Sequence, residues 1–297
     1  MNHSFVSAMW VAAWLGQVVG AQEAPPVRVL DVRGAATVSL AAGKAATALA
    51  AGQGLDAGST VKLDQGASAL LLLEDGKPVQ LQGPTQYTVP AKPSAAPAPG
   101  RSSLLESLWN RLKSLADSGG LKESAPGRVR GGGPDLLYPI GSIVEEAPTL
   151  QWARSDEAKT FLVTVRSVEG KTVASGTVQT CEYGVPAGVL NPGGMYTWEV
   201  VPLIHSRPAG VSQGFFELPE RAVLDSTARD VAAVRKQLGA AASEPAILLA
   251  VGAYLESKEL LGAALQAYRK AASKAGAGAL GELCRRAAES VQKRQAK

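Results

Sequence analysis

The spacing of apolar residues changes once along this chain, and that change limits the folds available to it. Over residues 27–89 and 136–218 the apolar residues occur in short alternating runs separated by glycine and proline, a pattern typical of half-buried β-strands. After Asp225 they recur every three or four residues, as in amphipathic helices. The sequence therefore predicts a multidomain protein with all-β amino-terminal and central domains and an all-α carboxy-terminal helical domain.

The stretch GQGLDAGST, residues 52–60, contains glycines and hydroxyl groups that could wrap a phosphate. The dinucleotide fingerprint, however, needs G-x-G-x-x-G between a strand and a helix, and here the third glycine, Gly58, comes one residue late. An alternating run follows from Val61, and Asp75-Gly76 lies where a tight hairpin needs two residues at positive φ. We therefore interpret residues 27–89 as a small all-β domain whose glycines form turns, with no cofactor-binding loop.

The first residues are typical of a secretory signal. An apolar stretch from about Phe5 to Val19 precedes small residues spaced for cleavage, which predicts a signal peptide over residues 1–21 with a cut after Ala21. Because the stretch before the apolar core contains no Lys or Arg, an uncleaved membrane anchor is the alternative. With cleavage, we expect a periplasmic or secreted protein.

The all-β segment resembles FecR-type domains, named after regulators of iron-citrate sensing. The matching positions are Gly34, Val38, Leu49, Gly52, Leu55, Gly58, residues 67–73, Asp75-Gly76, Val79, Leu81 and Gly83. The resemblance covers about a fifth of the chain and implies an envelope location and, as one alternative function, a signalling or regulatory module. Signalling members are expected to carry a cytosolic segment and a membrane helix ahead of this domain, whereas here only the export signal precedes it.

Residues 90–147 form a predicted linker rich in proline and glycine that encloses an amphipathic helix over residues 103–118. The apolar stripe of this helix consists of Leu105, Leu108, Trp109, Leu112 and Leu115. Because an isolated helix this short is marginal in water, the stripe must dock on something. The choices are the protein's own β-domain, a partner protein or a membrane surface. If the stripe is free, Leu105, Trp109 and Leu112 would anchor a partner.

Residues 148–219 resemble an immunoglobulin-like or fibronectin III-like sandwich. Alternating apolar residues over residues 160–167 are followed by a turn and a returning strand, and Trp152, Tyr196 and Trp198 lie on predicted strands. These aromatic residues are either core residues or a platform for stacking carbohydrate. Domains of this kind bind partners at loops or strand edges.

Residues 225–297 form the predicted helical domain. One pair of helices resembles a tetratricopeptide repeat, with Leu248, Gly252, Ala264, Tyr268 and Ala271 at the packing positions. A solenoid needs at least three repeats, and one clear unit is present. The resemblance therefore implies a helical cap or a peptide-binding hairpin.

Residues able to support catalysis are sparse. His205 is the only histidine after the signal segment, and it lies where a strand enters a loop without a G-x-S-x-G motif. Adjacent acids at Glu74-Asp75 and Glu145-Glu146 would point to opposite faces of extended chain. We therefore expect no catalytic, cofactor-binding or metal-binding residues, and no enzyme.

Two cysteines, Cys181 and Cys284, would meet an oxidising compartment after export, so a disulfide between them is one interpretation. The other is that Cys284, on the apolar stripe of the last helix, is a small buried hydrophobic residue. The formal net charge of +4 is modest and spread out, and basic patches interleaved with aromatic residues are lacking, which argues against nucleic acid as a partner.

The sequence as a whole indicates a non-catalytic exported cell-envelope protein that acts in protein-protein binding or scaffolding. Its partner would be another envelope protein, bound through the groove of the helical domain or through exposed edges of the sandwich. A FecR-like signalling module and a binder of cell-wall glycan are the alternatives.

Overall fold

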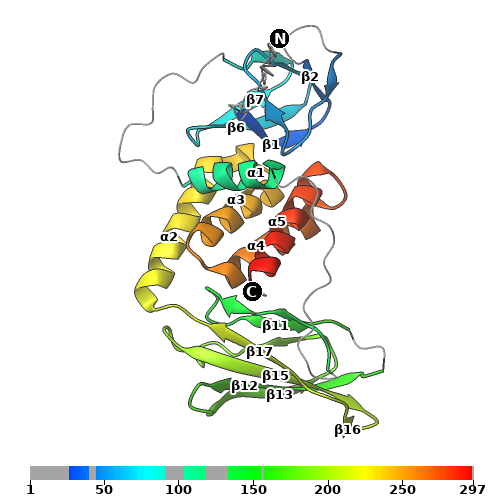
Figure 1. Cartoon of the computed structure of the whole chain (residues 1–297), viewed down its shortest axis with the longest axis vertical. Helices are drawn as coiled ribbons and strands as arrows, with labels where there is room; N and C mark the ends of the chain where they lie inside the picture. Colours follow the sequence, from blue (N-terminus) through cyan, green and yellow to red (C-terminus); the bar gives the residue numbers. More distant parts are fainter. Residues whose placement is uncertain (1–26, 40–44, 91–103, 118–132, 155–156, 296–297) are drawn as a thin grey trace, which may run out of the picture.

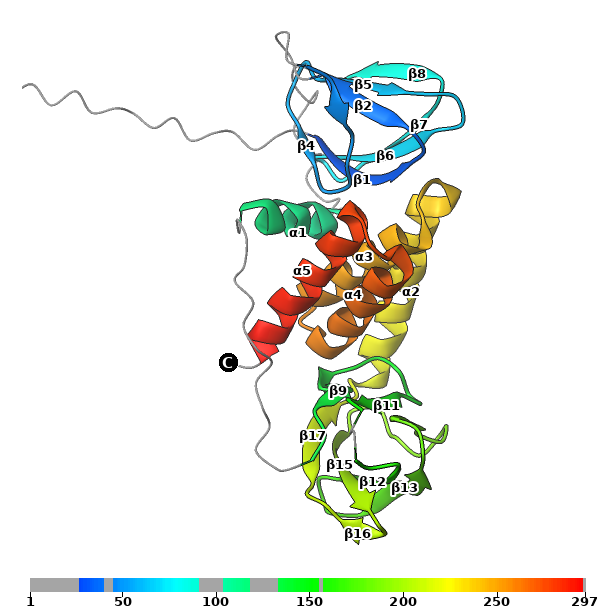
Figure 2. The ribbon, with the colours of Figure 1, turned by 90° about the vertical axis from the view of Figure 1, so that its right-hand side faces the viewer.

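The computed structural model describes residues 27–39, 45–90, 104–117, 133–154 and 157–295, so the predicted signal peptide lies outside the described part of the chain. Three units stack along one axis: a β-unit from the amino-terminal part, a helical unit, and a second β-unit (Figures 1 and 2). The carboxy-terminal helices lie between the two β-units, so the order in space differs from the order in sequence. The predicted fold class is confirmed.

The first β-unit consists of two four-stranded sheets with the orders β4-β1-β6-β7 and β3-β2-β5-β8. Its strands are β1 (Val27–Arg33), β2 (Ala36–Ser39), β3 (Thr47–Ala48), β4 (Gly54–Leu55), β5 (Thr60–Leu63), β6 (Ser68–Leu73), β7 (Pro78–Gln82) and β8 (Thr85–Thr88). The aliphatic residues that alternate into the space between the sheets form one core. The two-residue period seen in the sequence therefore builds this unit.

The glycines of this unit occupy turns, as predicted. Gly52 and Gly58 have φ of 83° and 80°, and the strand β5 rather than a helix follows them. The β6-β7 hairpin differs from the expected two-residue turn, because only Gly76 has a positive φ. Its amide donates to the Leu73 carbonyl (2.9 Å), and the Leu73 amide donates to the Lys77 carbonyl (3.0 Å), which makes a three-residue loop closed by a glycine in the left-handed region.

The second β-unit is a two-sheet sandwich, with one sheet in the order β10-β17-β15-β12-β13 and the other in the order β14-β11-β9. Its strands are β9 (Leu136–Tyr138), β10 (Gly141–Ser142), β11 (Thr149–Trp152), β12 (Thr160–Ser167), β13 (Thr172–Val178), β14 (Glu182–Gly184), β15 (Met195–Ile204), β16 (Arg207–Pro208), which pairs with β15, and β17 (Ser212–Glu217). The Tyr196 hydroxyl accepts a hydrogen bond from the Asn191 amide at 2.6 Å. This bond back to the upstream backbone is the tyrosine corner of immunoglobulin-like sandwiches.

The sandwich begins earlier than the predicted boundary at residue 148. Strand β9 pairs with β11 in the smaller sheet, and the chain then crosses over so that β10 pairs in parallel with β17 of the larger sheet. Residues 136–142 therefore belong to the sandwich and not to the linker of residues 90–147. Because these strands are only three and two residues long, their alternation is too short to stand out in the sequence.

The helical unit contains five α-helices among the described residues, namely α1 (Glu106–Asp117), α2 (Arg221–Leu238), α3 (Glu244–Ser257), α4 (Leu261–Ala275) and α5 (Ala279–Gln295). It starts at Arg221, slightly before the predicted residue 225, and a short 3-10 turn, η1 (Gly239–Ala241), follows α2. A Cβ atom on Gly252 would lie 2.5 Å from the Tyr268 ring, so α3 and α4 pack closely where these two of the five predicted packing positions meet.

The helical unit contacts both β-units directly. On one side, Leu30, Leu70 and Leu72 point away from the first β-unit's own core and pack among the helices. On the other side, the Arg269 side chain donates to the Leu137 carbonyl at 2.6 Å. At the same junction Gly262 of α4 meets the backbone of residues 140–142, where an added Cβ would lie 2.4 Å from the Ile140 carbonyl oxygen and 2.6 Å from that of Ser142. The glycine is what allows this approach.

We predict that Gly262→Ala lowers the free energy of unfolding by about 1–3 kcal/mol, because the methyl group would overlap backbone atoms that cannot move without shifting a strand. In an unhindered helix the same change stabilises by roughly 0.5–1 kcal/mol. Urea denaturation followed by circular dichroism measures the difference. Gly184→Ala, where the methyl would meet open space, is the matched control and should stay within about 0.5 kcal/mol. A stabilised Gly262→Ala protein would contradict the close junction.

Candidate functional site

The helical surface that a partner could use is covered by the protein's own α1. Leu105, Trp109 and Leu112, the predicted partner anchors, are 1%, 4% and 1% exposed and belong to the helical core. Helix α1 lies against α3 and α5, with the β1-β6 sheet on its other side (Figure 2). Docking within the chain, one of the sequence's alternatives, is therefore what occurs, and the surface includes helices as well as the β-domain. These residues are not available to a partner in this structure.

A buried network of charges fixes α1 in place. Glu256 of α3 is only 8% exposed, and its Oε2 lies 3.1 Å from Nε of Arg111 on α1. The same carboxylate accepts hydrogen bonds from the Tyr268 hydroxyl at 2.8 Å and from Arg294 Nη1 at 2.9 Å. Arg111 Nη2 donates to the Ala287 carbonyl at 3.0 Å. Four helices thus meet at one carboxylate, which pairs with Arg111 and shares Arg294 with Glu259.

The Tyr268 hydroxyl stays protonated at every ordinary pH and therefore remains a hydrogen-bond donor to Glu256. Burial raises the pKa of its hydroxyl well above the usual value, and the Glu256 carboxylate raises it further, while Arg111 acts in the opposite direction. The Arg111 guanidinium also lies 5.8 Å from the centre of the Tyr268 ring, within cation-π range. The Tyr268 ring therefore contacts Arg111, and its hydroxyl bonds to Glu256, so one side chain contacts both members of the ion pair.

Polar contacts of Asp31 and Arg28 help to attach the first β-unit to the helices. Asp31 Oδ2 accepts a hydrogen bond from the Ser243 amide at 2.7 Å, at the N-cap of α3. A carboxylate at a helix N-terminus is favoured by the exposed amides and the helix dipole. The Arg28 guanidinium lies 5.6 Å from the Trp109 ring of α1. Arg28 and Asp31 are both buried, so the contact between the first β-unit and the helices is part of the folded core and not a surface contact.

Strand β13 forms one edge of the larger sheet of the sandwich. This strand ends its sheet and contains neither proline nor a charged residue. The Tyr183 hydroxyl donates to the Ser175 carbonyl at 3.1 Å, which shows that Ser175 turns its backbone groups away from β12. In an antiparallel ladder every second residue faces the same side, so the amide and carbonyl of Thr177 also face outward.

An apolar surface adjoins this edge on the outer face of the same sheet. Leu162 of β12 pairs with Thr177 on one side and with Val201 on the other. Its side chain is 41% exposed, although its strand neighbours Phe161 and Val163 are buried in the sandwich core. Edge and apolar surface together resemble the sites where proteins accept an added strand.

The aromatic residues proposed for glycan stacking are core residues. Trp152, Tyr196 and Trp198 are all nearly inaccessible, and the Trp198 indole donates to the Pro139 carbonyl at 3.0 Å. The rings of Trp152 and Phe161 pack edge to face with centroids 5.4 Å apart. Carbohydrate stacking on these three residues is therefore wrong, and the core interpretation is right.

The residues considered for chemistry lie apart from one another. His205 and Ser206 have φ of 49° and 63° and form the exposed turn between β15 and β16. Glu145 accepts a hydrogen bond from the Tyr138 hydroxyl, whereas Glu146 pairs with Arg221 at the surface, so the two acids diverge. Burial raises the pKa of Tyr138, which keeps it a donor.

The described ranges contain neither a metal-ligand cluster nor a membrane-spanning helix. Over those ranges no three His, Cys, Asp or Glu residues gather as a metal site would require. Within the same ranges, no helix has the length and apolar character needed to cross a membrane.

The two cysteines do not form the disulfide that the sequence left open. Both are free thiols, Cys181 beside the sandwich core and Cys284 within the helical core. The two cores belong to different units, so the two thiols lie in separate parts of the molecule. Burial raises the pKa of Cys284 to about 12, which agrees with its interpretation as a small hydrophobic residue.

Comparisons with known proteins add little to this geometry. No family model matches the sequence, and no curated protein matches it either. Among solved structures, the chain is similar to a two-domain fibronectin type III segment of chicken tenascin, with 13% identity over 65% of this chain and 98% of that chain, at a TM-score of 0.24. A TM-score this low carries no structural argument. The sandwich assignment therefore depends on the order of the strands in the two sheets and on the hydrogen bond of Tyr196.

We predict that Glu256→Gln lowers the free energy of unfolding by about 3–5 kcal/mol, because the change leaves the buried Arg111 guanidinium without its counter-charge. Urea denaturation measures the change. Glu282→Gln removes an exposed carboxylate that pairs with Arg285 one helical turn away, and it should cost less than about 1 kcal/mol. Equal effects of the two substitutions would contradict the structural role of the network.

We predict that a thiol reagent at pH 8 modifies native Cys181 but not Cys284. Cys181 is partly exposed, whereas Cys284 is buried and its thiolate becomes abundant only near its raised pKa of about 12. Mass spectrometry of the labelled protein, before and after denaturation, gives the result. Cys181→Ser should abolish native labelling. Resistance of both thiols to reagent even in denaturant would instead indicate a disulfide.

Proposed function

We propose that this protein is a non-catalytic scaffold that binds another protein by accepting one of its strands at the edge of β13. The observation that carries the proposal is the outward-facing backbone of Ser175 and Thr177 on an uncharged strand that ends its sheet. An added strand would continue the ladder by bonding to the Thr177 amide and carbonyl and by replacing the Tyr183 hydroxyl at the Ser175 carbonyl. Specificity would come from its side chains along the surface at Leu162.

The packing of α1 supports the sandwich over the helical groove as the binding surface. In the helical unit, the stripe that could have anchored a partner is buried, and its removal would expose the Arg111 and Glu256 charges. A partner that displaced α1 would first have to compensate the free-energy cost of breaking the ion pair between Arg111 and Glu256. The β13 edge needs no such rearrangement beyond release of the Tyr183 hydroxyl from Ser175.

The stacking of the helical unit between the two β-units suits a protein that holds two binding partners at a fixed separation. The helical unit is bonded to both β-units, so that a partner held at β13 would stay at a fixed distance from whatever the first β-unit touches (Figure 1). The FecR-type and tetratricopeptide resemblances of the sequence support a role in the cell envelope and in binding. Export through the amino-terminal signal is part of the proposal, and mass spectrometry of the mature amino terminus tests it.

We predict that Thr177→Pro abolishes partner capture while the protein stays folded. Proline removes an amide that faces away from β12, so the sheet keeps its own hydrogen bonds, but an incoming strand loses one bond and meets the ring. The loss should be at least about tenfold in affinity. The measurement is the yield of adducts from a photo-reactive amino acid placed at Ser175 in whole cells.

Thr177→Ala is the matched control because it shortens the side chain and retains the amide. It should give the adduct obtained with the parent protein. The same adduct at the same yield from Thr177→Pro, with circular dichroism unchanged, would contradict strand addition. Absence of any adduct from the parent protein would contradict it as well.

A further inference from the structure

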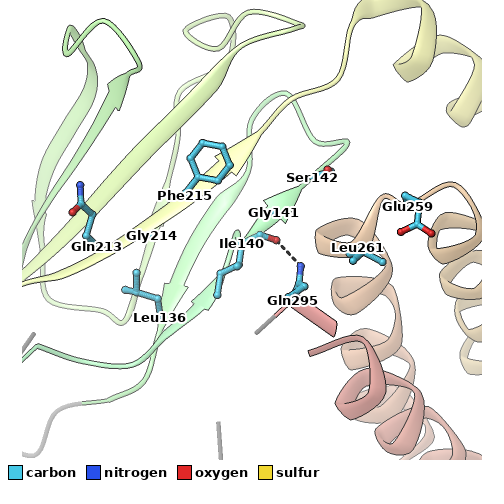
Figure 3. Close-up of a pocket in the computed structure, with 10 residues that line it drawn as sticks. All are labelled: Leu136, Ile140, Gly141, Ser142, Gln213, Gly214, Phe215, Glu259, Leu261 and Gln295. Carbon is cyan, nitrogen blue, oxygen red and sulfur yellow. Dashed lines mark hydrogen bonds between the residues drawn. The ribbon is translucent and has the colours of Figure 1, made fainter. Parts of the chain in front are cut away.

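A cleft of about 390 Å³ lies between the sandwich and the helical unit (Figure 3). One wall consists of Leu136 and Ile140 from β9 and the following turn together with Phe215 of β17. The other wall consists of Glu259, from the turn between α3 and α4, and Leu261, the first residue of α4. Domain junctions and volumes of this order are typical of ligand pockets.

The walls of this cleft are held in place before any ligand arrives. Gln295, near the end of α5, donates from Nε2 to the Ile140 carbonyl at 3.0 Å, the bond drawn across the cleft in Figure 3. Gly262 allows the start of α4 to approach the backbone of Ile140 and Ser142 in the same segment. A preformed cleft loses less entropy on binding than one that must close.

The lining favours an apolar group with a positive charge beside it. Leu136, Ile140, Phe215 and Leu261 supply apolar surface, and Phe215 is 43% exposed although it is aromatic. Glu259 is the one ionisable residue among those that line the cleft in the described part of the chain. The lining contains no Lys or Arg, so an acidic ligand would find no counter-charge in it.

The backbone at Glu259 is a second observation that singles out this carboxylate. The Leu260 amide donates to the Leu255 carbonyl and the Glu259 amide to the Glu256 carbonyl, each at 3.0 Å, which is the Schellman pattern at the end of α3. Its left-handed position is normally glycine or asparagine, yet here Glu259 occupies it with φ of 59°. A strained residue of this kind is a reason to look for a role in binding.

Glu259 already has one neighbour of opposite charge. Arg294 Nη2 lies 3.0 and 3.2 Å from its two carboxylate oxygens. Arg294 also holds Glu256 through Nη1 at 2.9 Å, so its guanidinium keeps a partner when Glu259 turns to another cation. The Glu259 side chain is 74% exposed and can reach such a cation.

We propose that this cleft binds a segment of a partner protein in which a large apolar residue is followed by lysine or arginine. The apolar side chain contacts Phe215 and Leu261, and the basic group pairs with Glu259. This site is separate from the β13 edge. Either can exist without the other.

Two blocked dipeptides test the site, N-acetyl-phenylalanyl-lysine amide and N-acetyl-phenylalanyl-glutamate amide. Each is titrated into the full chain at low salt and followed by NMR. We expect the lysine dipeptide to bind about two- to fivefold more tightly, as a partly screened charge pair predicts. Shifts should include the backbone amides of residues 136–142 and 259–262. Absence of shifts there with both dipeptides, or equal affinities for both, would overturn the proposal.

Three variants separate the contributions. Phe215→Ser, at an exposed position, should weaken both dipeptides at least fivefold, whereas Glu259→Gln should keep the apolar contact and make the two affinities equal. A lysine preference that survives Glu259→Gln would overturn the role of the carboxylate. Thr177→Pro should bind both dipeptides as the parent protein does, so failure of strand addition and failure of the cleft give different results.

Discussion

The carboxylate of Glu256 is the point on which the arrangement of this protein depends. It belongs to α3 and is contacted by side chains of α1, α4 and α5, namely Arg111, Tyr268 and Arg294. A buried carboxylate is costly unless a cation pairs with it, and the Arg111 guanidinium that pairs with Glu256 is carried by α1, so the network favours α1 in this position. The helix of the linker thereby becomes a structural element of the carboxy-terminal unit.

The position of α1 determines what the rest of the molecule can do. With α1 in place, Trp109 presents its ring to Arg28, and the outer face of the first β-unit covers the helices. The helical surface is then used within the chain, and the sandwich offers the remaining surfaces. The edge at Thr177 lies on that unit, and the cleft at Phe215 lies where that unit meets the turn between α3 and α4.

Much of this fold could be predicted from the sequence, because periodicity reports which side of an element is buried. The turn glycines and the core aromatics of the sandwich follow from local pattern, and so does the assignment of Gly252 and Tyr268 as packing positions. One available signal was missed. In β6, Leu70 and Leu72 alternate with Leu71 and Leu73, so both faces of the strand are apolar, which indicates that something covers the outer face.

Other features could not be predicted, because they depend on contacts distant in sequence. The partner of Arg111 lies in α3, and nothing near either residue identifies the other. The same holds for Asp31 at the N-cap of α3 and for the two short strands that begin the sandwich. Glu259 in a glycine position can be recognised only once the backbone of the turn is known.

Hydrogen-deuterium exchange of the α1 amides tests the central claim most directly. If α1 belongs to the helical unit, amides in the second half of residues 106–117 exchange as slowly as those of α3, because both open only when the unit unfolds. Exchange of α1 at nearly the rate of an isolated short helix, with α3 still protected, would contradict the account.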